Sequence, residues 1–296
     1  MSITAPETPK NKIDAIIDTD AFNEVDDQFA ISYLLRSDDK INTVAIYAAP
    51  FSFPHIGPAD GMAESFREIH TLLGLMGIEK EVYRGSTGYL PDEKTPVISD
   101  AARDLAKRAM EYTTENPLYV IAIGAITNIA SAILINPEIV NRIAVVWLGG
   151  HAHHYGITDE YNMRQDIAAS RVVMGSSVPF VQLPCMGVVS GFYISGDELR
   201  GRLIGKNELC DHLGEYVIEA MADVDHQDWT RVLWDVTAVA FLLNDGDRFM
   251  LTRVEDTRLS DYTQHYEPRG TGKPMRYVYH IHRDALMNDM IDKLTK

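Results

Sequence analysis

Short apolar runs alternate with segments of helical spacing through the first 185 residues. Five of these runs have the length and composition of buried strands: residues 15–17, 43–48, 118–123, 143–148 and 178–183. Apolar positions three and four residues apart predict helices that begin near residue 29 and cover 62–76, 126–134 and 165–174. This alternation predicts an α/β fold, with a mainly parallel sheet and helices on both faces.

The remaining segments are less regular. Ser99 and Asp100 are placed to cap a helix that reaches about residue 113. Farther on, residues 197–245 read as mainly helical, 276–281 as a strand and 285–294 as a helix. Residues 1–12 lack the apolar core of a signal peptide, so we expect a flexible tail there and a single domain over 13–296.

One uncharged stretch, residues 118–135, is long enough to be considered as a membrane helix. Gly124, Thr127 and Asn128 interrupt it, and its first part is β-rich while its second part has helical spacing. We therefore expect a strand, a turn and a buried helix, and no membrane association.

The stretch 13–36 concentrates acidic residues between a predicted strand and a predicted helix. Asp18 and Asp20 follow the strand, and Glu24, Asp26 and Asp27 precede the helix. Ligands of open α/β sheets bind outside the carboxyl ends of the strands. Five acids share such a crevice only if a cation neutralises them or if several face water. Because carboxylates are oxygen ligands, such a cation would be Ca²⁺ or Mg²⁺ rather than zinc. The alternative to a metal site is a solvated acidic loop, with Asp26 and Asp27 at a helix N-terminus.

Composition narrows the class of protein. The chain has 296 residues and a formal net charge of −16, which argues against a nucleic-acid partner because phosphate contacts need clustered Lys and Arg. Its two cysteines exclude a disulfide framework. These features fit a reducing cytoplasm.

A second carboxylate of interest lies far along the chain. Between residues 232 and 243 every side chain except Asp235 and Thr237 is apolar, which predicts a buried helix with Asp235 inside it. A lone buried carboxylate is costly unless it is paired or binds a metal. The alternatives are a salt bridge to an arginine, such as Arg231 or Arg248, and a metal ligand.

Four segments together resemble one known family. Residues 18–27 resemble the DTDxGxDD signature of the inosine-uridine preferring nucleoside hydrolases, with a longer loop at 21–25 that resembles an NExDD subgroup. Residues 124–130 resemble the family's GxLTNIA segment, and 160–162 resemble its EFN segment. Asp235 lies where the family supplies a distal calcium aspartate. The resemblance implies a nucleoside hydrolase-like, Rossmann-related fold.

The resemblance also implies a metal site and a catalytic base. It assigns Ca²⁺ to carboxylate oxygens of Asp20, Asp27 and Asp235 and to the main-chain carbonyl of Ile123. Asp20 is then the general base, while Asp18 holds the loop.

For the sugar, the resemblance assigns ribose hydroxyls to Asp26, Glu160 and Asn162. The family usually carries an asparagine after its second strand, where this chain has only small apolar residues at 48–50. Asn23 is our candidate for that hydroxyl contact. The alternative for the 160–166 segment is that Asn162 or Asp166 caps the following helix.

For the base, the family often places a histidine before the distal aspartate to protonate the leaving group. Trp234 stands there and is a candidate for stacking on the base. His151, His153 and His154 are expected at the pocket mouth or in solvent, with His154 as the candidate for substrate contact.

The predicted function is calcium-dependent hydrolysis of the N-glycosidic bond of a ribonucleoside, which yields ribose and a free base. The partner is a small-molecule nucleoside, and the family resemblance implies a homodimer or homotetramer. One alternative is a nucleoside- or ribose-binding protein without turnover, which Trp234 supports. Another is a haloacid-dehalogenase-like phosphatase, which would want Thr or Val where Phe22 stands.

Overall fold

A large mixed sheet forms the centre of the molecule. The computed structural model describes residues 5–224, 228–270 and 272–296. Over these residues the main sheet has eight strands in the order β3-β2-β1-β4-β5-β6-β10-β9. Neighbouring strands are parallel except β9 and β10. Their bounds are β1 (Ile13–Thr19), β2 (Ile41–Ala48), β3 (Val82–Arg84), β4 (Leu118–Ala122), β5 (Ile143–Leu148), β6 (Phe180–Leu183), β9 (Met250–Asp256) and β10 (Pro274–Ile281). The predicted, mainly parallel sheet is confirmed.

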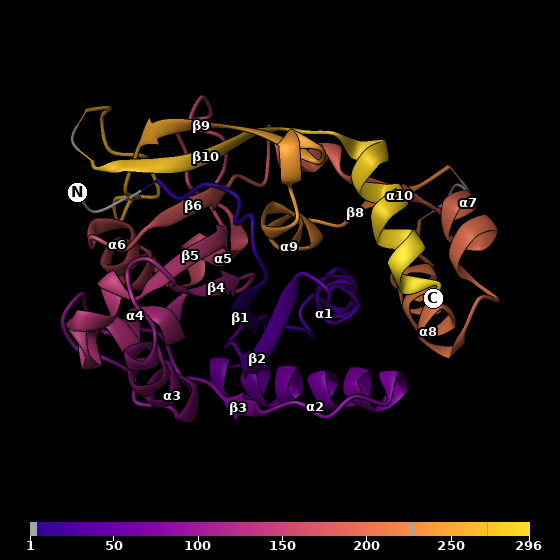
Figure 1. Cartoon of the computed structure of the whole chain (residues 1–296), viewed down its shortest axis with the longest axis horizontal. Coiled ribbons are helices and arrows are strands. Elements are labelled where there is room, and N and C mark those ends of the chain that lie inside the picture. The colour runs from indigo at the N-terminus through magenta and orange to yellow at the C-terminus, as the bar shows by residue number, and fades with distance from the viewer. Residues whose placement is uncertain (1–4, 225–227, 271) are drawn as a thin grey trace.

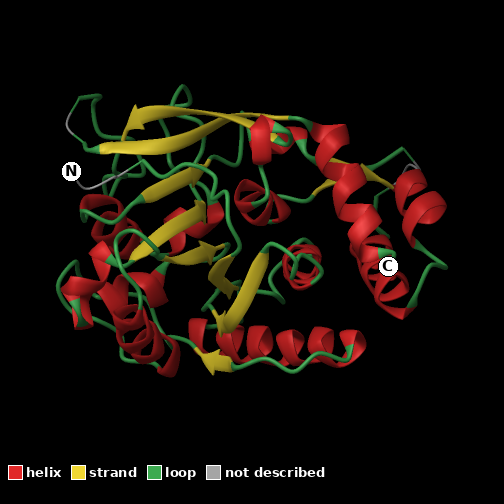
Figure 2. Cartoon of the chain, viewed as in Figure 1, coloured by secondary structure: helices red, strands yellow, loops and turns green. Residues whose placement is uncertain are grey.

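Helices cover both faces of this sheet, as predicted (Figure 1). One face carries α3 (Asp100–Arg108), α4 (Thr127–Ile135) and α6 (Ile167–Gly175). The other carries α1 (Asp27–Leu35), α2 (Pro58–Met76), α8 (Glu208–Ala220), α9 (Val236–Leu242) and α10 (Arg283–Leu294). Figure 2 shows the strands lying between these two groups of helices.

Short elements complete the chain. They are α5 (Tyr161–Gln165), α7 (Gly196–Glu198), and a two-stranded ribbon of β7 (Tyr193–Ser195) and β8 (Thr230–Val232). There are also the short 3₁₀ helices η1 (Ala109–Glu111), η2 (Pro137–Asn141), η3 (Val189–Gly191) and η5 (Asp245–Asp247), and a short π-helix, η4 (Leu199–Leu203).

The strand β1 shows why the predicted strands are apolar throughout. Successive side chains of a strand point to opposite faces, and both faces are covered here. Ala15 and Ile17 belong to the core on the α1 side, whereas Ile16 belongs to the core on the α4 side. All three are fully buried.

Several predicted boundaries were wrong because pairing partners lie far away in the sequence. Residues 230–232 form a strand rather than a helix, because β8 pairs antiparallel with β7. Asp235 is therefore the N-cap residue of α9 and not a residue inside a helix. The predicted helix over 165–174 is broken at Asp166, between α5 and α6. The strand β9 was not predicted.

Other local predictions hold. The Ser99 hydroxyl accepts a hydrogen bond of 3.1 Å from the Ala102 amide and caps α3. The uncharged stretch 118–135 is β4, a turn and α4. In the described part of the chain, no helix combines the length and the apolar character needed to cross a membrane.

The N-terminal segment makes contacts with the main body. Residues 1–4 of the expected tail lie outside the described residues. In the rest of it, the Pro6 carbonyl accepts a hydrogen bond of 3.0 Å from Arg276, and the Thr8 hydroxyl donates one of 3.3 Å to the Phe241 carbonyl.

The strand order reverses between β1 and β4, so the crevice for a ligand lies beyond the carboxyl ends of these two strands. The ladder continues for one step past β4, where the Ile123 amide donates to the Asp18 carbonyl at 2.9 Å. The acidic stretch and the Ile123-Gly124 turn therefore meet at this point.

Candidate active site

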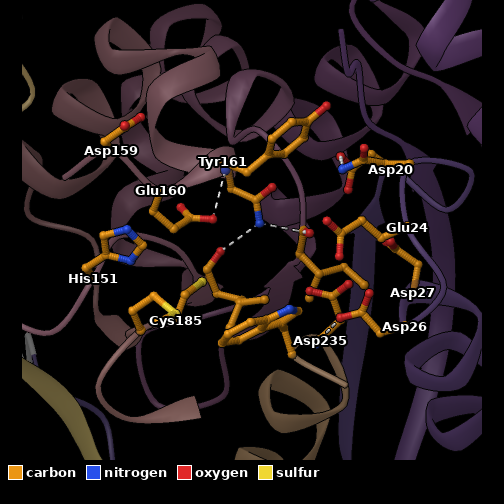
Figure 3. Close-up of a pocket in the computed structure, with 16 residues that line it drawn as sticks. Asp20, Glu24, Asp26, Asp27, His151, Asp159, Glu160, Tyr161, Cys185 and Asp235 are labelled. Atoms are coloured by element: carbon orange, nitrogen blue, oxygen red, sulfur yellow. Dashed lines mark hydrogen bonds between the residues drawn. The ribbon is translucent and has the colours of Figure 1, made fainter. Parts of the chain in front are cut away.

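A cavity at the β1–β4 crevice gathers the acidic side chains (Figure 3). Asp20 enters it from the loop after β1, and Asp26 and Asp27 enter it from the start of α1. Asp235 reaches it from the start of α9, more than two hundred residues later. Each of these four residues is at most 4% exposed. The solvated-loop alternative is therefore wrong for these carboxylates.

Three of the carboxylates form a tight cluster. Oxygen atoms of Asp26, Asp27 and Asp235 lie within 4.8 Å of one another. Burial and the neighbouring negative charges raise the pKa of Asp27 and Asp235 well above the usual range. Burial, followed by the charge of Glu24, raises the pKa of Asp26 to about 7. Like charges this close are stable in ionised form only beside a cation.

The candidate arginines do not neutralise Asp235. Arg231 pairs with Glu24 at 2.5 Å between Nη2 and Oε2, and Arg248 pairs with Asp289 at 3.2 Å between Nη1 and Oδ1. The salt-bridge alternative for Asp235 is therefore wrong for both. Among the residues that the structure describes, the cluster is a set of hard oxygen donors that fits a divalent cation such as Ca²⁺ or Mg²⁺.

Asp20 lies in the same cavity, beside this cluster rather than within it. Burial and the charge of Asp27 raise its pKa well above the usual range. Its Oδ2 accepts a hydrogen bond of 3.0 Å from Asn23 Nδ2. A Cβ at Gly124 would lie 2.8 Å from its Oδ1, so the carboxylate is packed against the backbone of the β4–α4 turn.

Asp18 is fully buried and does not line the cavity. Its Oδ1 accepts a hydrogen bond of 2.7 Å from Asn128 Nδ2, and burial raises its pKa to about 7. Asn128 in turn accepts from the Ser86 amide at 2.8 Å. These contacts tie β1 to α4 and agree with the loop-holding role expected for Asp18.

The segment after β5 supplies the opposite wall. Both amide hydrogens of Asn162 are used, because Nδ2 donates to the carbonyls of Ile123 at 3.1 Å and Leu148 at 3.0 Å. The Glu160 carboxylate caps α5 by accepting from the amides of Asn162 and Met163, each at 2.9 Å. Asn162 thus holds together the ends of β4 and β5.

In this segment, acidic side chains cap the two helices α5 and α6. Asp166 accepts from the Ala169 amide at 2.9 Å and caps α6, which confirms that alternative. Asn162 makes no cap, because Glu160 occupies that position for α5. The Glu160 carboxylate also accepts from the Gly150 amide at 2.8 Å, so it joins the loop after β5 to α5.

Trp234 lines the cavity next to Asp235, and the histidines separate into three positions. His151 lines the cavity, with its Nδ1 buried. His153 is buried behind it, where its Nδ1 lies 2.9 Å from Glu255 Oε2. His154 is exposed, lies against the Tyr155 ring and does not line the cavity. The structure thus places His151, and not His154, in the cavity. The expectation for His153, at the pocket mouth or in solvent, is wrong, because this side chain is buried.

Sequence reasoning did not pick out several residues that line the cavity. They are Leu148, Asp159, Tyr161, Cys185 and Met186. Most of them follow the carboxyl ends of β5 and β6. Because ligands bind at the carboxyl ends of parallel strands, the predicted strands themselves could have indicated these segments.

The comparisons with known proteins agree with this geometry. The model of the inosine-uridine preferring nucleoside hydrolase family matches residues 15–287. The chain belongs to this family. Family members are N-ribosyl hydrolases and depend on a metal, so the chain is an enzyme of this class, and the phosphatase alternative is wrong.

Solved structures share the fold at low sequence identity. A purine-preferring ribonucleoside hydrolase from Gardnerella vaginalis is 19% identical, with a TM-score of 0.73 over 95% of this chain and 98% of that one. An inosine-uridine preferring nucleoside hydrolase from Bacillus anthracis is 18% identical, with a TM-score of 0.68 over 96% and 99%. The type III effector protein XopQ, in complex with adenosine diphosphate ribose, is 14% identical, with a TM-score of 0.71 over 97% and 94%. No curated protein sequence matches the chain.

Proposed function

We propose that this nucleoside hydrolase cleaves the N-glycosidic bond of a ribonucleoside in a calcium-dependent reaction, which releases ribose and a free base. One observation carries the proposal. Three buried carboxylates from two distant segments come within 4.8 Å of one another, in a cavity that also holds Asp20. Such an arrangement is unfavourable without a cation and is suited to one.

The residues that would hold the metal are Asp20, Asp27, Asp235 and the carbonyl of Ile123. Asp26, whose Oδ2 accepts the Asp235 amide at 3.1 Å, stands directly beside them. All are oxygen donors, and Ca²⁺ takes about 6–8 of these. When bound, the cation lowers the pKa of a coordinated water and neutralises the clustered carboxylates.

Asp20 acts as the general base in this proposal. It accepts one proton of a water molecule while the water oxygen bonds to the anomeric carbon. The carbon–nitrogen bond breaks, and its electron pair leaves with the base. Positive charge develops on the sugar in such reactions, and the surrounding carboxylates favour it.

The sugar and the base occupy the rest of the cavity. Because both Asn162 amide hydrogens already bond to carbonyls, its Oδ1 is the atom left to accept a ribose hydroxyl. Asp26 and Glu160 provide further acceptors, since a carboxylate has about four lone-pair sites. Trp234 offers an aromatic face for the base.

The test is a panel of ribonucleosides assayed for free reducing sugar, with and without a chelator. We expect release of ribose that stops when the metal is removed and returns with added Ca²⁺. Binding of nucleosides without any release would favour the alternative of a binding protein, which the tryptophan at position 234 supports. Mg²⁺ restoring activity where Ca²⁺ fails would contradict the choice of metal.

The variant Asp20→Asn tests the assignment of Asp20 as the general base. This substitution keeps the size of the side chain but removes the proton acceptor, so ribose release should fall by about 100- to 10,000-fold. A cooperative thermal unfolding transition checks that the variant is folded. Asp38→Asn, at an exposed position on the α1–β2 loop, is the matched control. Near wild-type turnover by Asp20→Asn would remove the assignment.

We also propose that the protein is cytoplasmic and forms a homodimer or homotetramer. Sedimentation equilibrium of the full chain measures the oligomeric state, and a monomer at all concentrations would contradict the proposed oligomer.

A further inference from the structure

Asn23 makes two separate bonds to Asp20. It lies in the loop between β1 and α1, the part of the signature that is longer here than in the family pattern. Its main-chain amide donates to the Asp20 carbonyl at 2.7 Å, which closes the turn. Its side-chain Nδ2 donates to Asp20 Oδ2 at 3.0 Å. Because the main-chain bond already closes the turn, the turn itself does not require the side-chain bond.

The other end of this side chain lacks a partner. Asn23 Oδ1 is buried and has no hydrogen bond within the described part of the chain. With Asp20 ionised, as its role as general base requires, the amide cannot be turned around, because Oδ1 would then face a carboxylate that only accepts hydrogen bonds. Buried polar atoms in proteins are nearly always satisfied. Asn23 lines the cavity, so a molecule bound there is the candidate for the missing donor.

The neighbouring loop offers no such contact. Residues 48–50, the last residue of β2 and the two after it, are buried and carry no side-chain donor or acceptor. A Cβ at Gly124 would lie 3.1 Å from the Ala49 methyl carbon and 2.8 Å from Asp20 Oδ1, so Ala49 and Asp20 flank the same turn. Residues 48–50 therefore give Asp20 no side-chain hydrogen bond. The side-chain amide that bonds Asp20 comes instead from Asn23, in the longer loop between β1 and α1.

We propose that Asn23 is a positioning residue for the hydrolytic step, an inference that rests on the proposed function. Its Nδ2 fixes the Asp20 carboxylate, and its Oδ1 accepts a hydrogen bond from the attacking water. Asp20 removes one proton of that water, and Asn23 holds the other. The water lone pair is thereby directed at the anomeric carbon, while the N-glycosidic bond breaks towards the base.

The experiment compares Asn23→Ala, Asn23→Asp and Phe22→Ala with the wild type on the nucleoside that the wild type cleaves best. Phe22 is the adjacent loop residue, is 40% exposed and does not line the cavity, so its variant controls for loop disturbance. Asn23→Asp keeps the size of the side chain and guards against misfolding of the alanine variant. We expect kcat to fall about 10- to 100-fold in both Asn23 variants, with KM changed less than about threefold.

Two further readouts separate positioning from other roles. With methanol added, the ratio of methyl riboside to ribose should rise in Asn23→Ala, because the water site is less selective. Calorimetric titration of Asn23→Ala with Ca²⁺ should give the wild-type stoichiometry and an affinity within about threefold, so that lost turnover is not lost metal.

Each contrary outcome has a distinct meaning. An unchanged kcat in both Asn23 variants overturns the inference. A raised KM, together with lost discrimination against 2′- or 3′-deoxynucleosides, also overturns it and assigns Asn23 to a sugar hydroxyl. If the wild type releases no ribose from any nucleoside, the proposed function fails.

Discussion

At the scale of single residues, the site depends on how closely backbone and carboxylate approach. Gly124 is the clearest case. It stands between Asp20 Oδ1 and the Ala49 methyl group, and it follows the carbonyl of Ile123 that we assign to the metal. Contacts of 2.8 and 3.1 Å leave no room for a methyl group at this position without displacing the carboxylate.

Gly124→Ala should therefore reduce kcat/KM by about 100-fold, because a misplaced base and carbonyl lose both the water and the metal geometry. Gly88→Ala is the matched control, since a Cβ there meets nothing within 4 Å. The measurement is steady-state kinetics with thermal unfolding of both variants. Equal activity of the two variants would show that the turn tolerates the methyl group.

At the scale of elements, polar side chains lock the helices that frame the cavity. Asp166 separates α5 from α6 and accepts three different donors. Besides the Ala169 amide, these are the Leu90 amide at 2.9 Å and the Thr127 hydroxyl at 2.7 Å, which link α6 to the β3–α3 loop and to α4. Ser99 makes fewer bonds: its hydroxyl accepts the capping bond from its own helix and donates one weak bond of 3.4 Å to Asn128 Oδ1.

Asp166→Ala should lower the free energy of unfolding by about 2–3 kcal/mol, since it removes a cap and leaves buried donors unpaired. Ser99→Ala should cost only about 1 kcal/mol. Urea denaturation of the two variants measures the difference. A loss in Asp166→Ala no larger than that in Ser99→Ala would indicate that the links to α4 and to the loop contribute little.

At the scale of the whole molecule, the buried carboxylates couple stability to pH and metal. A carboxylate whose pKa is raised on folding binds more protons in the folded state than in the unfolded state, so stability falls as pH rises. For Asp26 this loss begins above about pH 4, where the unfolded group ionises, and is complete above its folded pKa of about 7. Asp20, Asp27 and Asp235 shift in the same direction.

The metal-free protein should therefore unfold at a lower temperature at pH 8 than at pH 5. Added Ca²⁺ should raise the midpoint more at pH 8 than at pH 5, because its ligands must be deprotonated. Thermal unfolding in chelator and in Ca²⁺ across this range makes the measurement. Asp235→Asn should flatten the pH dependence of the metal-free protein. Identical pH profiles for the variant and the wild type would contradict this account of the cluster.

Much of this protein follows from local pattern. The strands β1, β2, β4 and β5 and the helices between them could be predicted because their apolar spacing is set within a few residues. The placement of Asp18 and Asp20 at a strand end could be predicted for the same reason. Together with the four family segments, this was enough to indicate a cation site at the carboxyl edge of a parallel sheet.

The tertiary structure decided what depends on residues far apart in the chain. The pairing of β7 with β8 places Asp235 at the N-cap position of α9, beside Asp26 and Asp27, instead of inside a helix. The loop after β5 brings His151, and not His154, into the cavity. Such outcomes depend on which surfaces pack together, since pairing and burial are properties of the folded chain and not of any short segment.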